Sequence, residues 1–350
     1  MKNLPLVLAA TCSLPLLALG QNPEAPRQTR HTFGASVPVW LNARAKFTAT
    51  RATDPGPAAG GVVNRRYDDG YNLVDSAGNA AAVVGGPPST SFFGYASDAQ
   101  VVNAAGAGTL SLHSVQLNGG GYTRNLDNQP FPGVEFFYRY DWRAGRNWRL
   151  HWELGAAYNC FKWEQNGDPN STVNLLTDVF ALGGVALGAA PYNGPSVALP
   201  GSPVIGSTPT RTEATAAAAV AGTRKLELHA VQVRVGPALD WVPNDKWTVG
   251  LQGGLALGVG FSQLSFAEQI TVTAPNIAAL NQSGRTADAH SWVGLFSAVR
   301  VNRQLGRNWD AHVELRHLLT DKLRHSGATR SGEISLAEGV GVAAGLSYRF

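Results

Sequence analysis

Residues 339–350 read GVGVAAGLSYRF, and this stretch alternates strictly between two kinds of side chain. One face is apolar and ends in aromatics: Val340, Val342, Ala344, Leu346, Tyr348 and Phe350. The other face is small or polar: Gly341, Ala343, Gly345, Ser347 and Arg349. A period of two residues is typical of a β-strand with one apolar and one wet side. We therefore predict that this strand closes a transmembrane antiparallel up-and-down β-barrel.

The composition of the 350-residue chain fits a β-protein with many turns. It has 40 glycines, one Met and only 15% charged residues. After residue 20 no apolar run reaches the ~20 residues that a spanning helix needs. A membrane location would therefore require a closed barrel, in which every backbone polar group is paired.

The first 20 residues are predicted to form a cleaved secretory signal peptide. Lys2 gives a basic start, residues 4–19 form the apolar core, and Ala18-Leu19-Gly20 offers small residues for the peptidase. A membrane anchor is the alternative, which two prolines disfavour. Cleavage leaves Cys160 without a disulfide partner. It also leaves 27 basic against 24 acidic residues, a charge of +3 that is too dispersed to indicate nucleic-acid binding.

Other segments alternate in the same way and predict further strands. Residues 133–143 and 148–159, joined by the short turn 144–147, give the clearest hairpin signal. The remaining predicted strands are 33–47, 226–241, 247–261, 293–301 and 309–319. With the terminal strand they make eight, within one barrel domain over residues 21–350. Ten strands would result if residues 90–118 supplied another pair.

Short turns alternate with long connections along the chain. Long loops are predicted at about 48–131 and 164–223, with shorter ones at 271–288 and 320–331. The short turns are 144–147, 243–246 and 305–308. This asymmetry is expected of an outer-membrane barrel with periplasmic turns and extracellular loops. A change of apolar phase near His229 additionally predicts a β-bulge in its strand.

Aromatic residues cluster beside the short turns. They would form an interfacial belt at one depth: Trp142, Trp148, Trp241, Trp247, Trp309, Tyr348 and Phe350. Amphipathic rings favour the boundary between bilayer and water. A soluble sandwich with a Trp-rich core would explain the alternation but not this clustering.

Taken together, these features resemble bacterial outer-membrane β-barrel proteins of the small OmpA- and OmpX-like type. The resemblance covers the signal segment, residues 33–47 and residues 133–350. It implies a bacterial outer-membrane location, contact with outer-membrane lipid, and recognition of the C-terminal strand by the barrel-assembly machinery. The segment 67–79 is also similar to uncharacterised members of this class, which suggests no role.

The inward faces of the predicted strands carry the charged residues. The expected lumen network comprises Arg44, Glu135, Arg139, Arg149, His151, Glu153, Arg234, Asp240, Arg300, Asp310, His312, Glu314 and Arg316. Lys46, Asp141 and Arg349 share these faces. An eight-stranded lumen is only wide enough to be filled by side chains, and buried charges must be paired. We therefore predict a mutually neutralising plug.

A repeat within this network suggests an alternative. Residues 145–154 recur as residues 306–315, and each copy points a His and a Glu inward. His151, Glu153, His312 and Glu314 could form a catalytic or metal site, but we expect neither a metal nor another cofactor.

Two weaker site signals lie in the predicted loops. Asp68, Asp69, Asp75 and Asn79 could bind calcium, but they lack EF-hand spacing and also suit turns. His325-Ser326, near His317, is similar to a feature of membrane-embedded lipid A deacylases.

The sequence thus predicts a small outer-membrane barrel with a charged, plugged lumen that acts through its extracellular loops in structure or surface recognition. We expect it not to be an enzyme. A narrow porin for small polar solutes is the alternative, and a lipid-modifying enzyme is the second. No motif in the loops names an extracellular ligand.

Overall fold

The computed structural model describes residues 31–49, 52–53, 56–74, 88–103, 107–117, 124–126, 130–194, 201–273, 277–337 and 339–350. These residues form antiparallel β-strands with one short 3-10 turn, η1 (Asp98–Gln100). The predicted all-β architecture is therefore confirmed. In the described part of the chain, no helix is both long and apolar enough to cross a membrane. The predicted signal peptide, Asp75 and Asn79 lie outside the described residues.

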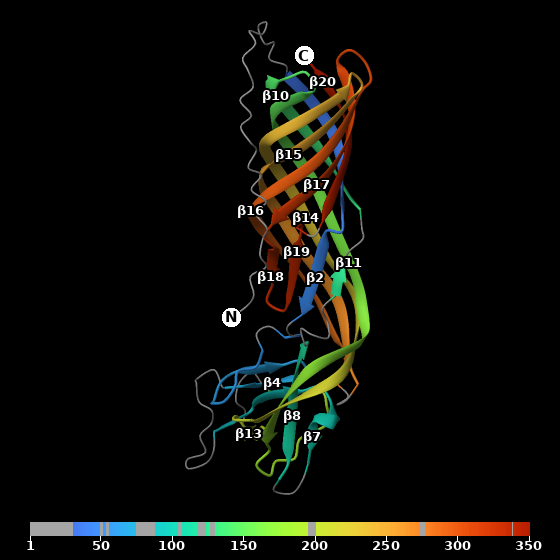
Figure 1. Ribbon diagram of the computed structural model, residues 1–350. Coiled ribbons are helices and arrows are strands. Elements are labelled where there is room, and N and C mark those ends of the chain that lie inside the picture. The colour runs from blue at the N-terminus through green and yellow to red at the C-terminus, as the bar shows by residue number, and fades with distance from the viewer. Residues whose placement is uncertain are drawn as a thin grey trace.

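Eight strands pair with one another in a ring (Figure 1). Their order is β10 (Phe131–Ala144), β1 (His31–Leu41), β20 (Val340–Arg349), β17 (Trp309–Thr320), β16 (Leu280–Gln304), β15 (Trp247–Val272), β14 (Thr210–Asn244) and β11 (Trp148–Ala181), and β11 pairs with β10. The terminal strand β20 lies between β1 and β17, with Arg349 opposite Thr32. The first and last described strands of the ring are thus neighbours.

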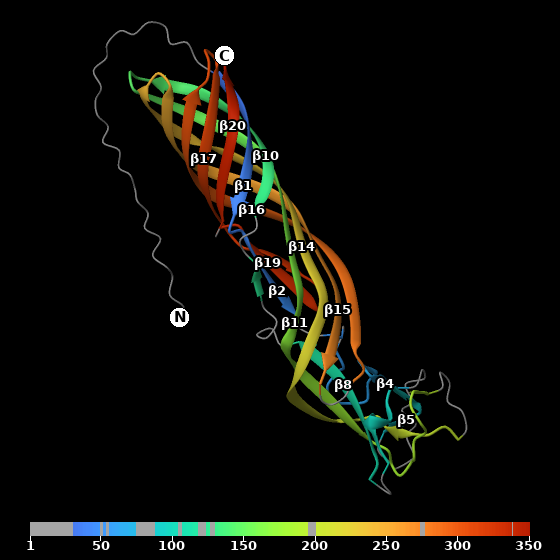
Figure 2. The ribbon, with the colours of Figure 1, turned by 90° about the vertical axis from the view of Figure 1, so that its right-hand side faces the viewer.

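Four ring strands continue far beyond the other four. β11 and β14 have 34 and 35 residues, whereas β1 and β20 have 11 and 10. β15 and β16 are also long, with 26 and 25 residues. One side of the ring therefore extends as a curved sheet, formed by the far parts of β11, β14, β15 and β16 and here called the extension (Figure 2).

Much of the predicted loop at 164–223 is strand in the structure, because β11 reaches Ala181 and β14 starts at Thr210. Likewise β15 reaches Val272 and β16 starts at Leu280, so both strands enter the predicted loop at 271–288. The low-complexity sequence still buries alternate side chains, including Val173 and Val220, in a second apolar cluster. A weak alternation is thus sufficient to form strands where neighbouring strands offer an apolar surface to pack against.

A second sheet faces this extension. It contains β18 (Leu323–Ser326), β19 (Arg330–Ser335), β2 (Arg44–Ala49) and β9 (Arg124–Leu126), in that order. The predicted loop at 320–331 is therefore largely the β18–β19 hairpin. Arg330 of β19 and Arg224 of β14 both bind Glu268 of β15, and these buried ion pairs join the two sheets.

The predicted single strand 33–47 is divided at Asn42. This residue has φ +58°, in the left-handed region that Asn tolerates better than most residues. Before it, Val37 and Leu41 face outward and are exposed; after it, Ala43 and Phe47 are buried. The chain leaves the ring here, so the expectation of one continuous outward face was wrong.

The far end of the molecule is a small folded unit. It contains a sheet of β12 (Tyr192–Asn193), β6 (Phe92–Tyr95), β4 (Gly70–Leu73) and β3 (Arg65–Tyr67), together with the β13–β5 pair (Ile205–Gly206 and Ser89–Thr90). β8 (Thr109–Leu117) pairs with the far end of β11, and β7 (Val101–Val102) pairs with β8. The predicted loop at 48–131 thus holds strands, and the pair from residues 90–118 joins the extension rather than the ring.

Candidate functional site

The outside of the ring is apolar. On β15 the outward side chains of Leu251, Leu255, Leu257, Val259 and Phe261 are between 49% and 68% exposed. Equivalent exposed apolar residues occur on the other ring strands: Phe33, Val37, Phe136, Leu154, Val233, Leu295, Val313 and Leu346. Together they form a broad apolar surface, far larger than the patches on ordinary soluble monomers.

One edge of this surface carries the seven predicted belt residues. Trp148 lies opposite Trp241, and Trp309 lies opposite Tyr348, whose ring makes an edge contact with Phe350. Trp142 and Trp247 are exposed beside the turns at the same end. The structure therefore gathers these rings where the short turns are.

The opposite edge ends in a cross-strand group on β11, β14 and β15. The Tyr158 hydroxyl lies 2.7 Å from His229 Nδ1, and His229 lies opposite Phe261. Immediately beyond, the outer surface becomes charged, with the Lys162–Glu227 pair at 3.1 Å. The apolar surface thus has two sharp limits.

Inside the ring, four arginines and three glutamates form one buried cluster, here called the charge layer. Its members are Glu135, Arg139, Glu153, Arg234, Arg300, Glu314 and Arg316, all between 0% and 7% exposed. They come from five ring strands, β10, β11, β14, β16 and β17, because alternate residues of each strand point inward.

Each glutamate of the charge layer binds more than one arginine. Glu153 accepts hydrogen bonds from Arg139 Nε at 2.7 Å and from Arg300 at 2.5 and 3.0 Å. Arg316 donates to Glu135 at 2.8 and 3.1 Å and to Glu314 at 2.7 Å. Such charge-assisted, bidentate contacts hold planar guanidinium groups in fixed positions. The layer is therefore a shared network rather than a set of separate pairs.

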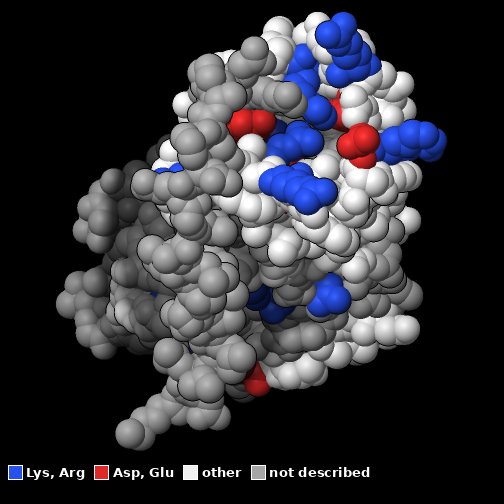
Figure 3. All heavy atoms as spheres, turned by 45° about the horizontal axis from the view of Figure 1, so that its top comes forward, with Lys and Arg blue, Asp and Glu red and all other residues white. Residues whose placement is uncertain are grey.

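The mouth of the ring beside the short turns is also lined by charged groups (Figure 3). Arg349 pairs with Asp310, and His151 Nδ1 lies 3.8 Å from Asp240. The pocket at this mouth, which is lined by Asp240, Asp310, Arg349 and Arg149 among others, has a volume of only about 20 Å³. That volume holds about one water molecule. The mouth therefore leads into packed side chains.

Most of the predicted network residues lie inside the ring, with one clear exception. Arg44, together with Lys46, is exposed on β2, because the chain has already left the ring at Asn42. Placing Arg44 in the lumen was therefore wrong. His151, His312, Asp240 and Asp310 are buried, whereas Arg149 is half-buried at the mouth.

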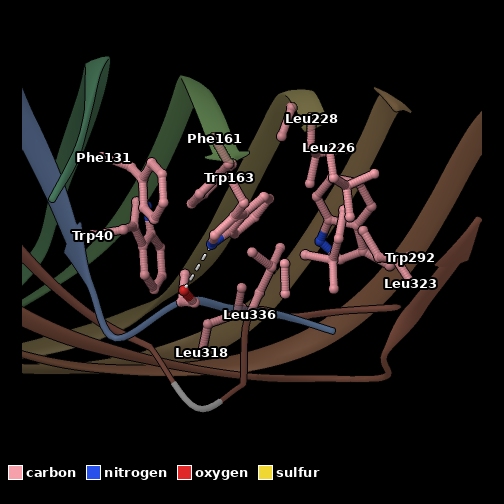
Figure 4. Close-up of a cluster of buried hydrophobic side chains, with 14 of the residues drawn as sticks. Trp40, Phe131, Phe161, Trp163, Leu226, Leu228, Trp292, Leu318, Leu323 and Leu336 are labelled. Atoms are coloured by element: carbon pink, nitrogen blue, oxygen red, sulfur yellow. Dashed lines mark hydrogen bonds between the residues drawn. The ribbon is translucent and has the colours of Figure 1, made fainter. Parts of the chain in front are cut away.

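An apolar layer that the sequence did not predict fills the other end of the ring (Figure 4). Its ring-strand members include Trp40, Phe131, Phe161, Trp163, Leu226, Leu228, Trp292, Phe296 and Leu318, and the second sheet and its connections add Ala45, Phe47, Leu323, Ile334 and Leu336. Trp163 Nε1 donates to the Ala43 carbonyl at 3.2 Å. The two layers touch where the Arg234 guanidinium lies 4.9 Å from the centre of the Phe296 ring.

This layer explains the apolar phase change near His229. The pairing of β14 with β11 and β15 runs through His229 without a shift, so the predicted bulge is absent there. Leu226 and Leu228 instead face inward to the apolar layer, while Val231 and Val233 face outward. The environment of the inner face changes, not the phase of the strand.

The proposed His and Glu quartet does not stand free as a ligand set. Glu153 and Glu314 are held by arginines, and His312 packs edge-on against Phe137 at 5.1 Å between ring centres. Carboxylates committed to guanidinium groups are poor candidates for a metal site or for acid–base chemistry.

The two loop acids also have structural partners. Asp69 accepts from the backbone N–H of His113 at 2.7 Å and lies 2.6 Å from its Nδ1. Asp68 accepts from the Val115 N–H at 2.7 Å, and burial raises the pKa of its carboxyl. Both carboxylates therefore fix β8 in place, which does not favour the calcium reading.

The structure brings together a group of hydroxyls and an imidazole that no spacing in the sequence indicates. His325 is buried on β18, and burial lowers the pKa of its imidazole. Its partners are Ser262 of β15 and Thr286 of β16, while Ser326 points to the opposite, exposed side of β18. The His325-Ser326 dipeptide is therefore not a functional pair.

No family model and no curated protein matches the chain. Among solved structures, it is similar to the attachment invasion locus protein Ail of Yersinia pestis in complex with a heparin analogue, at 11% identity and a TM-score of 0.26, over 91% of this chain and 99% of Ail. The outer membrane protease OmpT of Escherichia coli matches at 9% identity and TM-score 0.33, covering 93% and 99%. A FadL homologue of Pseudomonas aeruginosa matches at 9% and 0.19, covering 92% and 90%.

The ring of eight antiparallel strands and its exposed apolar exterior, both described above, agree with the predicted resemblance to outer-membrane β-barrel proteins. The expectation that the chain is not an enzyme does not stand. One of the similar structures is a protease, and enzyme status is therefore not established.

Proposed function

We propose that the ring spans the bacterial outer membrane as a plugged barrel and that the extension presents a rigid recognition surface to the outside. The observation that carries this proposal is the double filling of the ring, by the charge layer and by the apolar layer. A barrel filled in this way serves as an anchor. The part left to act on other molecules is the extension.

The apolar surface has the height that a membrane barrel needs. From Leu251 to Phe261, the outward face of β15 covers ten residue steps. At about 3.3 Å per residue and a tilt of about 40°, this is about 25 Å along the ring axis, as in outer-membrane barrels. The interfacial belt of seven aromatic residues would lie at one interface between bilayer and water, and the Tyr158–His229–Phe261 group would lie at the other.

The extension has the construction of a platform rather than of mobile loops. Successive buried clusters run along it, and the Arg224–Glu268–Arg330 ion pairs separate two of them. A surface that is already ordered loses little conformational entropy when it binds a partner. This supports a role in surface recognition.

The proposed orientation predicts the result of labelling intact cells. Val102 is 56% exposed on β7, and Arg307 is exposed in a short turn. In a Cys160→Ala background, we expect a membrane-impermeant maleimide to label Val102→Cys in intact cells. The control Arg307→Cys is expected to react only after the outer membrane is permeabilised. If only Arg307→Cys were labelled in intact cells, the barrel would have the opposite orientation to the one proposed.

The filled interior predicts that the protein does not conduct. In planar bilayers, we expect the purified chain to show no steady single-channel openings, because no water path passes the two layers. Heat-modifiable migration on gels would show that the sample is folded. Regular openings from folded protein would exclude the plugged barrel and favour the narrow porin.

A further inference from the structure

Two potential metal ligands lie on the same face of β16, where this strand has passed the end of β17. Asp288 and His290 are two residues apart, so their side chains point the same way. Pairing between β16 and β17 stops at Gly294, opposite Thr320, and Asp288 is exposed to solvent here. An ion could therefore reach this face from solution.

The third ligand comes from the second sheet. His325 of β18 is only 1% exposed. Its ring packs against the face of β16 that carries Asp288 and His290, beside Thr286. The ligand atoms of Asp288, His290 and His325 all lie within 4.8 Å of one another. No other group of three His, Cys, Asp or Glu residues among those described comes together in this way.

Hydrogen bonds orient the two imidazoles toward one point. Ser262 Oγ lies 2.7 Å from His290 Nε2 and 2.6 Å from His325 Nδ1, so both nitrogens converge on this hydroxyl. On its other side, His325 Nε2 lies 2.8 Å from Thr286 Oγ1. When Nε2–H donates to Thr286, the Nδ1 lone pair is directed at the same point. Outer partners of this kind fix the tautomer of metal-binding histidines.

We infer that Asp288, His290 and His325 bind a divalent transition-metal ion such as Zn²⁺ between β16 and β18. Two imidazoles and one carboxylate are a ligand set that zinc accepts, with water in the fourth position. A tetrahedral site needs ligand atoms about 3.3 Å apart. The ligand atoms now lie up to 4.8 Å apart, so binding requires a small movement. The exposed Asp288 side chain is free to make this movement toward the ion. The ion would join the β18–β19 hairpin to the free edge of β16.

Metal titration of the untagged, refolded full chain tests this inference. After treatment with EDTA, we expect calorimetry to show one equivalent of Zn²⁺ bound, and Co²⁺ to give the visible absorption of a tetrahedral site. Asp288→Asn and His325→Ala should each weaken zinc binding more than tenfold. Thr286→Val, which removes only the outer partner, should weaken it by about 10- to 100-fold.

The control is His317→Gln, which changes a histidine on the neighbouring strand β17 and should leave zinc binding unchanged. Asp288 is exposed, so its variant tests the site even if His325→Ala does not fold. Absence of zinc uptake by the wild type would overturn the inference. So would normal binding by folded Asp288→Asn, or loss of binding only when His151 and His312 are replaced.

Discussion

Replacing Glu153 by Gln is expected to destabilise the protein by about 3–5 kcal/mol, the usual cost of removing one partner from a buried charge network. Glu153 neutralises Arg139 and Arg300, and Arg234 lies 3.7 Å away. The amide keeps the shape of the side chain but leaves these guanidinium groups under-compensated where water cannot reach them. Equilibrium unfolding of the refolded protein in lipid vesicles by guanidinium chloride would measure the loss.

Glu227→Gln is the matched control, because it removes the same charge from a surface pair with Lys162. Exposed pairs contribute about 0–1 kcal/mol, so this variant should unfold almost as the wild type does. Equal losses for the two variants would show that the charge layer is hydrated rather than sealed. The proposed plug would then be wrong.

Leu255→Arg is expected to cost about 2–4 kcal/mol, because it places a charge near the middle of the lipid-facing surface. Leu255 is 49% exposed and lies between Leu251 and Val259 on the outward face of β15. In water, an exposed Leu→Arg change would alter stability by only about 0.5 kcal/mol. The size of the loss, measured by unfolding from vesicles, therefore reports whether this surface contacts lipid.

Ala267→Arg provides the control on the same face of the same strand. Ala267 is exposed and lies beyond Phe261, where the outer surface has become charged. We expect it to tolerate Arg with a change within about 0.5 kcal/mol. A penalty at Ala267 as large as that at Leu255 would place the lipid boundary further out than the Tyr158–His229–Phe261 group.

The sequence predicted the ring because its signals are local. Alternation shows which residues share a face, so Leu255 could be assigned outward and Glu153 inward without knowing any neighbour. The short turns, with their tryptophans, likewise appear within a few residues of one another. The charge layer followed because charges on an inner face must compensate one another.

The apolar layer and the second sheet could not be predicted in this way. Leu226 and Leu228 alternate like the rest of their strand, but what they contact is decided by Phe47 and Ile334, from distant parts of the chain. Alternation identifies which residues share a face, but it does not say what that face contacts. The prediction of a bulge at His229 is wrong because it assumes that apolar residues always face outward. Arg44 was misplaced for a related reason, since nothing in the sequence marked the turn at Asn42.

The metal ligands show the same division between local and distant signals. Asp288 and His290 are two residues apart and could have been noticed as a pair on one strand face. His325 and Ser262 join them only through the packing of β18 against β15 and β16. No spacing rule connects these three strands.

The length of β14 sets a fixed reach for whatever its far end holds. From His229, at the proposed lipid boundary, to Thr210 there are nineteen residue steps, or at most about 63 Å at 3.3 Å per residue. A flexible tether of nineteen residues would have a mean span of only about 24 Å and would point in every direction. Here the same length of chain is a stiff stalk shared by several strands. A partner bound at its tip would be held at a set distance and angle from the cell, beyond short surface molecules that would screen a binding site close to the bilayer.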